Sequence, residues 1–297
     1  MESKEIARAV HAYDALKMHE KRLGYRSLPA FIGIGPGRAG TTSLFSLLQR
    51  NAKVHLPSVK ELNYFGFRSR QSQPSVGMTL DEYSTYFIGA PRNAICGEIS
   101  PAYFILPDAI REIASALPDC RLISGLRHPF ERLLSHFKYH RENHGYTDLD
   151  AFIEKAREDF PHRRDPRLTH HWFTPVRILA SSLYADTLAL CGELLPREHI
   201  LIYLFEDYVR SQASAQAIQH FLGVEPVADP ASRMNASELD GSRLTLRRGN
   251  FDWLREILLE DLARCMTPGV PPLNAYIESL QRGNPAELGI EITLDPG

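Results

Sequence analysis

Cysteine is scarce in this sequence, and its cysteines lie far apart. The four are Cys96, Cys120, Cys191 and Cys265, and none of them forms a CxxC pair. Zinc sites and thiol redox motifs use closely spaced cysteines, and small secreted domains use many cysteines for disulfides. We therefore expect no disulfide framework, no metal site and a reducing compartment.

Long apolar runs and a strong excess of one charge are also missing. The first residues, MESKEIARAVHAYDALKMHEKR, are highly charged and lack the apolar core of a signal peptide. No run of about 18 apolar residues is present that would span a bilayer. The formal net charge is -2, so the chain as a whole does not attract nucleic acid or anionic lipid. We expect a cytoplasmic protein with no membrane span and no nucleic-acid partner, in which any anion site is a local arginine cluster.

Strand patterns alternate with helix patterns over most of the chain. The strand patterns cover 29–35, 93–99, 120–126 and 199–205, and the helix patterns cover 41–50, 108–117, 129–143, 176–195, 214–223 and 251–266. Such alternation predicts an α/β, P-loop-like fold of three layers, in which helices flank a mostly parallel central sheet. Ligands of such sheets bind at the carboxyl ends of the strands.

The same patterns predict a single domain over residues 1–297. Its parts are a helical N-terminal extension over about 1–25, a nucleotide-binding core over about 30–225, and a C-terminal loop and helix over about 226–297. No internal repeat or low-complexity linker interrupts this plan.

A glycine-rich turn, GPGRAG, joins the first predicted strand to the first core helix. It matches the GxGxxG pattern of dinucleotide-binding folds, and Glu61 lies near the position of an acid that would bind a ribose. The turn also has the spacing of a P-loop, but Thr41 replaces the lysine that contacts the β- and γ-phosphates. A third interpretation is a site for a shorter anion, bound by backbone N–H groups, the helix N-terminus and the guanidinium of Arg38. A tight turn without a ligand is the remaining alternative.

A second basic cluster follows the third predicted strand. Arg127 ends that strand, and Ser135 lies in the second turn of the next helix, near its positive N-terminal end. Together they can bind a phosphate, separately from the glycine turn. The alternative is that Arg127 only pairs with a carboxylate such as Glu131, as many surface arginines do. Two anion sites favour one nucleotide with a phosphate group at each end.

Four stretches of the sequence carry a family resemblance: GPGRAGTTSL, VKELNYF, GEISPAYF and LRHPFERLLSHF. In this order and spacing they resemble the P-loop sulfotransferases, most of all the heparan-sulfate-type and bacterial branch. The resemblance covers about residues 30–225 and implies 3′-phosphoadenosine 5′-phosphosulfate as co-substrate, with no metal required. It implies that Arg127 and Ser135 hold the 3′-phosphate. It also implies that the 5′-phosphosulfate lies on Arg38, Ala39, Gly40, Thr41, Thr42 and Ser43.

The resemblance further implies catalytic roles for Lys60 and Glu61. In heparan-type enzymes the matching Lys-Glu pair lies beside the sulfuryl group, so Glu61 is expected to be the general base. Lys60 and Arg38 are expected to stabilise the charge on the transferred group. The sequence departs from some relatives at Asn63, where they carry histidine. His55 and Glu98 are alternative bases, although we expect Glu98 instead to hold loops together through hydrogen bonds.

Three further features have two interpretations each. Tyr184 matches a tyrosine of the family, for which we expect a packing role. Arg247, Arg248 and Gly249 resemble a basic loop that closes over the nucleotide, or they form ordinary charge pairs. The basic stretch at 161–175 faces an acidic acceptor, or is a solvated loop.

Taken together, these features predict a sulfotransferase. It moves a sulfuryl group to a hydroxyl or an amine of a small-molecule, lipid or carbohydrate acceptor. The alternatives are an NAD(P)-dependent oxidoreductase that uses the GPGRAG turn, and a nucleotide-binding protein without catalytic activity.

Overall fold

The computed structural model describes residues 28–66, 78–163, 173–228, 244–265, 269–288 and 290–293. The chain divides into two compact units. Unit 1 comprises 1–36, 40–125 and 189–234, and unit 2 comprises 37–39, 126–188 and 235–297. The expected helical extension at 1–25 and most of the basic stretch at 161–175 lie outside the described residues. The organisation of the chain as a single domain stays a prediction.

Unit 1 contains a five-stranded sheet with the strand order β2-β3-β1-β4-β5. Strand β1 pairs in parallel with β3 and β4, and β2 pairs in parallel with β3. All five residues of β1 are buried, as expected for a central strand covered on both faces. The strands are β1 (Phe31–Gly35), β2 (Val54–His55), β3 (Ile95–Ile99), β4 (Arg121–Leu126) and β5 (Ile200–Leu204).

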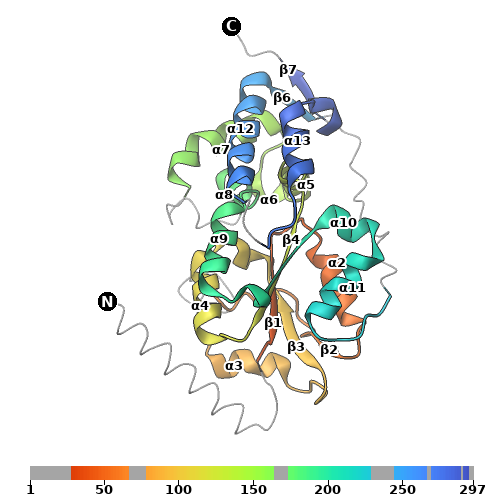
Figure 1. Cartoon of the computed structure of the whole chain (residues 1–297). Coiled ribbons are helices and arrows are strands. Elements are labelled where there is room, and N and C mark those ends of the chain that lie inside the picture. The colour runs from red at the N-terminus through yellow and green to blue at the C-terminus, as the bar shows by residue number, and fades with distance from the viewer. Residues whose placement is uncertain are drawn as a thin grey trace. The chain divides into compact units, whose positions relative to one another are not determined.

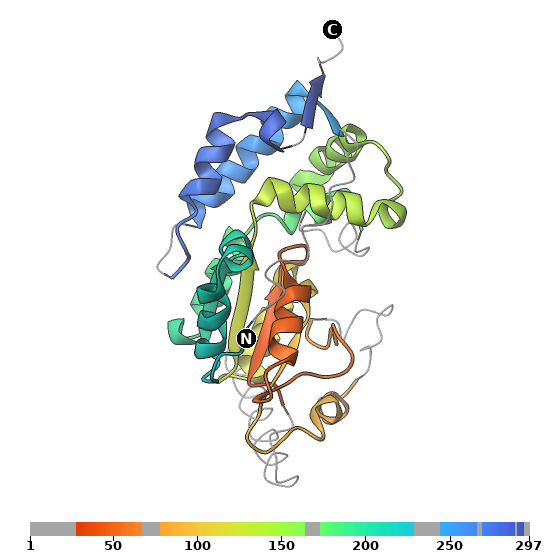
Figure 2. The same cartoon turned by 90° about the vertical axis from the view of Figure 1, so that its right-hand side faces the viewer.

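Helices cover both faces of this sheet, which makes the three layers of the predicted α/β fold. Figures 1 and 2 show α2 and α11 together on one face and α4 on the other. Beneath α2 and α11 lies a hydrophobic core, which includes Phe31, Leu44, Leu47 and Ile218. The helices of unit 1 are α2 (Thr41–Gln49), α3 (Leu80–Ser84), α4 (Pro107–Ala116), α10 (Phe205–Arg210) and α11 (Gln212–Phe221), with the short 3₁₀ helices η1 (Thr85–Phe87), η2 (Pro101–Ile105) and η4 (Arg197–His199).

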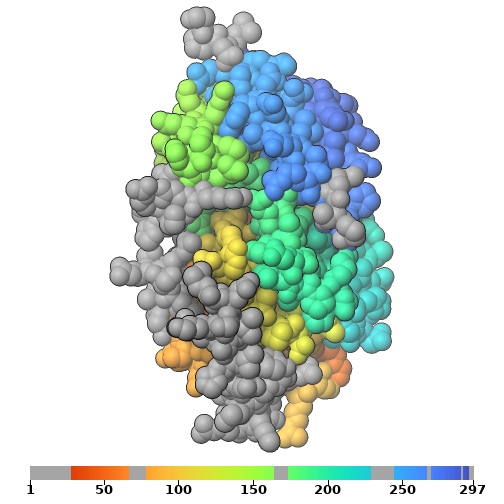
Figure 3. Space-filling view, turned by 60° about the vertical axis from the view of Figure 1, so that its left-hand side comes forward, coloured from red at the N-terminus to blue at the C-terminus, as the bar shows by residue number. Residues whose placement is uncertain are grey.

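Unit 2 is mainly helical and carries a small parallel sheet of strands β6 and β7. Helices α7 and α12 are in contact and lie side by side at the surface (Figure 3). Aromatic rings fill the interior: Phe137 lies 5.1 Å from Phe152, and Phe130 lies 5.7 Å from Phe251, between ring centroids. The elements are α5 (Pro129–Tyr139), α6 (Arg141–His144), α7 (Leu149–Asp159), η3 (Phe160–His162), α8 (Pro175–Ala180), β6 (Leu244–Arg247), α12 (Arg248–Arg264), α13 (Asn274–Arg282), η6 (Pro285–Leu288) and β7 (Ile290–Thr293). Helix α9 (Ala185–Leu194) spans the boundary between the units.

The structure confirms the α/β class and all four predicted strands, and it corrects two predicted helices. The helix expected over 129–143 is two helices, α5 and α6, which meet at His140. The long helix expected over 176–195 is wrong, because α8 ends at Ala180 and α9 begins at Ala185. At this break the carboxylate of Asp261 accepts the backbone N–H groups of Tyr184 and Ala185. A carboxylate at that position caps a new helix, which the local apolar pattern cannot reveal.

The C-terminal part holds strands that the sequence did not predict. The C-terminal loop and helix expected over about 226–297 included no strand, but β6 occupies 244–247 and pairs with β7 at 290–293. Both strands are four residues long, and a β-pattern that short is weak in a polar context. Strand β2 was missed for the same reason, since it has only two residues.

Candidate functional site

The glycine turn connects β1 to α2, as predicted, and glycine is required at its end. Gly40 is the N-cap of α2 and has φ 85°, in the left-handed region. A Cβ atom at this position would lie 2.6 Å from the Phe205 ring. Both the backbone conformation and the close approach therefore exclude a side chain. The end of β1 is also anchored from the next strand, because the Ser124 hydroxyl donates to the Gly35 carbonyl at 2.8 Å.

Lys60 lies against the first turn of α2. Its Nζ donates to Thr42 Oγ1 at 2.9 Å and lies 3.8 Å from Glu61 Oε1. Burial lowers the pKa of Lys60, and the nearby Glu61 charge opposes that shift. The side chains of Lys60 and Glu61 are 27% and 47% exposed, so both remain accessible from solvent. The ammonium group of Lys60 and the carboxylate of Glu61 thus lie at the N-terminal end of α2.

The two alternative bases lie on strands β3 and β2. Glu98 on β3 is 1% exposed, and both its carboxylate oxygens accept hydrogen bonds from neighbouring hydroxyls. Burial raises the pKa of Glu98, and those hydroxyl donors oppose the rise. A carboxylate enclosed in this way has no access to an acceptor, so the expectation that Glu98 holds loops together is met. His55 lies on the edge strand β2, where it pairs in register with Cys96.

Arg38, Arg127 and Ser135 come together in unit 2. Arg38 Nε donates to Ser135 Oγ at 3.1 Å, and Arg127 Nη1 lies 3.5 Å from the Arg38 carbonyl oxygen. The guanidinium of Arg38 also stacks on the ring of Tyr139, at 4.1 Å from its centroid. The sequence assigned Arg38 and Ser135 to opposite ends of the nucleotide, whereas the structure joins them directly. The pairing of Arg127 with Glu131 is present too, at 3.4 Å.

The cluster holds an excess of positive charge. Burial is the main cause that lowers the pKa of Arg38, and the charge of Arg127 lowers it further. The partner of Arg127, Glu131, has a 45% exposed side chain, so solvent weakens its compensating effect. Guanidinium groups that repel one another in a partly buried place favour the binding of an anion.

Arg132 completes this cluster, and sequence reasoning did not single it out. It is fully buried. Its Nη1 donates to the Gly37 carbonyl at 3.0 Å and its Nε to Ser182 Oγ at 2.7 Å, while Nη2 donates to the Ile178 carbonyl. Burial lowers the pKa of Arg132 to about 10. The available signal was an arginine among the apolar residues of LRHPFERLLSHF, one helical turn before Ser135.

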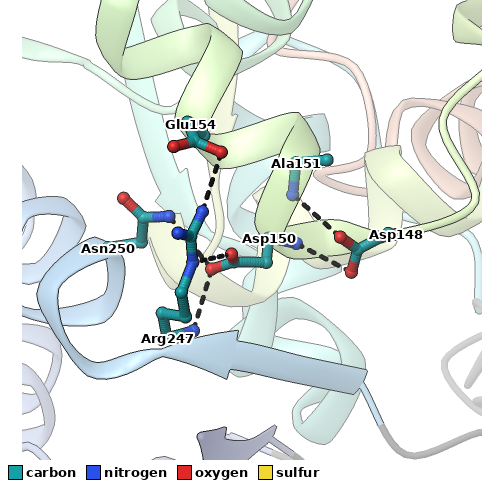
Figure 4. A network of polar contacts seen from close by, with 6 residues as sticks. All are labelled: Asp148, Asp150, Ala151, Glu154, Arg247 and Asn250. Carbon is teal, nitrogen blue, oxygen red and sulfur yellow. Dashed lines mark hydrogen bonds and ion pairs between the residues drawn. The ribbon is translucent and has the colours of Figure 1, made fainter. Parts of the chain in front are cut away.

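The remaining motifs have structural partners. Tyr184 is fully buried, and its hydroxyl donates to the Arg127 carbonyl at 2.7 Å, which agrees with a packing role. Arg247 forms ion pairs with Asp150 and with Glu154, the latter at 2.7 Å (Figure 4). Arg248 pairs with Asp252 at 2.7 Å. These two arginines are therefore engaged in charge pairs.

The network around Asp150 joins three elements of unit 2. In addition to the side chain of Arg247, Asp150 Oδ1 accepts from the backbone N–H of Arg247 at 2.8 Å and from Asn250 Nδ2 at 2.9 Å. Asp148 accepts from the N–H groups of Asp150 and Ala151 and caps α7 (Figure 4). The contacts tie α7 to the end of β6 and the start of α12.

The sheet does not follow the dinucleotide-binding arrangement. In that arrangement the strand order is 3-2-1-4-5-6, so the first strand lies beside the second. Here β1 lies between β3 and β4, and β2 is at the edge. In the described part of the chain no group of three or more His, Cys, Asp or Glu residues is arranged to hold a metal ion. None of the described helices has the length and apolarity needed to cross a membrane.

Comparisons with known proteins confirm the resemblance to sulfotransferases. The sequence matches no family profile. It is 30% identical over 112 residues to a membrane-associated sulfotransferase of Dictyostelium discoideum; this segment is 38% of the chain and only 23% of that protein. The fold is similar to that of a sulfotransferase from Alicyclobacillus acidocaldarius, with a TM-score of 0.66 and 23% identity over 84% of this chain and 98% of the other. The fold is less similar to that of a sulfotransferase domain from the curacin biosynthetic pathway. That comparison has a TM-score of 0.43 and 14% identity, and it covers 90% of this chain and 99% of that domain.

Proposed function

We propose that the protein is a sulfotransferase that uses 3′-phosphoadenosine 5′-phosphosulfate as donor. The observation that carries the proposal is the meeting of Arg38, Arg127 and Ser135 in one cluster of excess positive charge. A nucleotide with a phosphate at its 3′ position supplies the anion that such a cluster favours. The expected acceptor is a hydroxyl or an amine of a small molecule, lipid or carbohydrate, and the expected compartment is the cytoplasm.

Each residue group has one task in this proposal. Arg127 and Ser135 hold the 3′-phosphate, and the backbone and side chains of Ala39, Gly40, Thr41, Thr42 and Ser43 hold the 5′-phosphosulfate. Oriented N–H groups at the start of α2 supply fixed positive dipoles without any reorganisation. Arg38 and Lys60 add full positive charges to stabilise the group that is transferred.

The transfer itself needs one base. The acceptor oxygen or nitrogen forms a bond to sulfur, the sulfur–oxygen bond to the 5′-phosphate breaks, and adenosine 3′,5′-bisphosphate leaves. The acceptor proton goes to the carboxylate of Glu61, which is half-exposed and lies 3.8 Å from Lys60. Lys60 lies beside this carboxylate and stabilises the charge on the group that is transferred. A positioned general base contributes about 10²–10⁴-fold to such a rate.

Two measurements test the proposal. Adenosine 3′,5′-bisphosphate should raise the melting temperature of the protein by mass action on the folded state, and NADH should not. Incubation with the donor and a panel of hydroxyl- and amine-containing acceptors should give products heavier by one SO3 group in a mass spectrum. Binding of the bisphosphate without any transfer would favour a non-catalytic nucleotide-binding protein. Stabilisation by NADH alone would favour the oxidoreductase.

A further inference from the structure

A buried carboxylate in unit 1 collects three hydroxyl groups. Tyr83 donates to Glu98 Oε1 at 2.6 Å, Tyr103 donates to the same oxygen at 3.0 Å, and Ser100 donates to Oε2 at 2.7 Å. The backbone N–H of Leu62 is a fourth donor to this carboxyl group. All of these partners donate to the carboxyl group, so hydrogen bonds hold both of its oxygens in place.

Two of these hydroxyls also accept from the segment that follows Glu61. Ser100 Oγ accepts the N–H of Asn63 at 3.2 Å. Tyr103 Oη accepts the N–H groups of Tyr64 and Phe65, at 2.8 Å and 3.3 Å. The backbone N–H groups of four consecutive residues, 62 to 65, therefore end on Glu98 either directly or through one hydroxyl.

This segment needs such support because its backbone is strained. Glu61 has φ 61° and Asn63 has φ 50°, both in the left-handed region that residues with a side chain disfavour. Such conformations persist only where the surroundings determine them, and they cluster at functional sites. The Glu98 network supplies these surroundings on the C-terminal side of Glu61, while the bond from Lys60 to Thr42 fixes the residue before it.

We propose that Glu98 is a positioning residue for sulfuryl transfer, which acts through Tyr103 and Ser100 on the backbone that carries Glu61. The inference rests on the proposed function and extends it, since it names the residues that aim the base. Glu98 itself touches neither donor nor acceptor. Its carboxylate orders two hydroxyls and the N–H of Leu62, the hydroxyls order the N–H groups of the next three residues, and the ordered backbone keeps the Glu61 carboxylate directed at the acceptor.

The two tyrosines provide a matched pair of variants. Tyr83→Phe and Tyr103→Phe each remove one buried hydroxyl that donates to Glu98 Oε1, and each keeps its aromatic ring. Only the hydroxyl of Tyr103 also accepts from the segment after Glu61. A purely structural role of the network predicts similar losses of melting temperature and similar kinetics for both variants.

The positioning role predicts a different result. Tyr103→Phe should lower kcat by on the order of 10²-fold, the usual consequence of a misplaced catalytic group, and should leave the KM for the donor near the wild-type value. Tyr83→Phe should keep kcat close to wild type even if its melting temperature falls equally. Equal kcat values for the two folded variants would overturn the inference while leaving the proposed function intact.

A measurement independent of turnover completes the test. Amide hydrogen exchange of residues 62–65 should speed up in Tyr103→Phe and in Glu98→Gln, and should stay protected in Tyr83→Phe. Unchanged protection in Tyr103→Phe would also overturn the inference. If the wild-type protein transfers no sulfuryl group to any acceptor, the proposed function fails, and the exchange experiment still decides whether Glu98 orders this segment.

Discussion

Replacing Ser135 by alanine removes a single hydroxyl from the cluster that also contains Arg38 and Arg127. In the structure this hydroxyl accepts from Arg38 Nε at 3.1 Å, and in the proposed complex it also binds the 3′-phosphate. A hydrogen bond to a charged group is worth about 1.5–3 kcal/mol, so we expect the affinity for adenosine 3′,5′-bisphosphate to fall about 10- to 150-fold. The affinity for adenosine 5′-phosphate, which lacks the 3′ group, should hardly change.

Titration calorimetry with both nucleotides measures this difference. Ser181→Ala is a suitable control, because Ser181 is also a buried serine of unit 2 and its hydroxyl donates within its own helix, to the Arg177 carbonyl at 3.0 Å. It should leave both affinities unchanged. An equal loss for the two nucleotides in Ser135→Ala, or no loss for either, would refute the assignment of Ser135 to the 3′-phosphate.

The remaining predictions concern the base, the pH dependence of stability and the sheet. Glu61→Gln should lower kcat about 10²–10⁴-fold in a transfer assay, with bisphosphate affinity retained; persistent activity would place the base elsewhere. Burial raises the pKa of Asp261 from 3.8 to about 6, so the folded state binds this proton more tightly than the unfolded chain. Its contribution to the free energy of unfolding should therefore decrease as pH rises from about 4 to about 6, and urea titrations should show that Asp261→Asn lacks this slope. Gly97→Ala should destabilise the fold by about 1–3 kcal/mol, because the added Cβ would meet the Phe31 ring at 2.2 Å. Gly192→Ala, which adds a Cβ in open space within α9, should instead stabilise the fold by about 0.5–1 kcal/mol. Urea titrations of both glycine variants measure these changes in the free energy of unfolding.

The layered core was predictable from the sequence because local pattern and burial agree there. Strand β1 is apolar along its whole length, and α2 repeats leucine at positions 44, 47 and 48, which its buried face requires. The glycine-rich turn alone was enough to predict the connection from β1 to α2. The resemblance implied that Lys60 lies beside the sulfuryl group, whereas its contact with Thr42 is seen only in the structure.

Other parts of the site depend on contacts between residues far apart in the chain. The break between α8 and α9 requires Asp261, which lies many residues later in the sequence. The bond between Arg38 and Ser135 joins side chains that the motif treats as separate, because the motif orders residues along the chain and carries no distances. The support of the Glu61 segment comes from the hydroxyls of Ser100, at the N-cap of η2, and Tyr103, within η2, and the sequence motifs do not reveal these contacts.

The guanidinium of Arg132 links the carbonyl of Gly37 to the Ile178 carbonyl and the Ser182 hydroxyl. A lysine cannot replace it, since one ammonium group does not reproduce the planar fork that reaches these acceptors from several nitrogens. In the proposed complex, a change at Ser182 would therefore disturb Arg132 and, through it, the glycine turn that holds the donor, although Ser182 lies far from that turn in the chain. The proposed donor affinity would thus depend on a residue that lies outside all four family motifs.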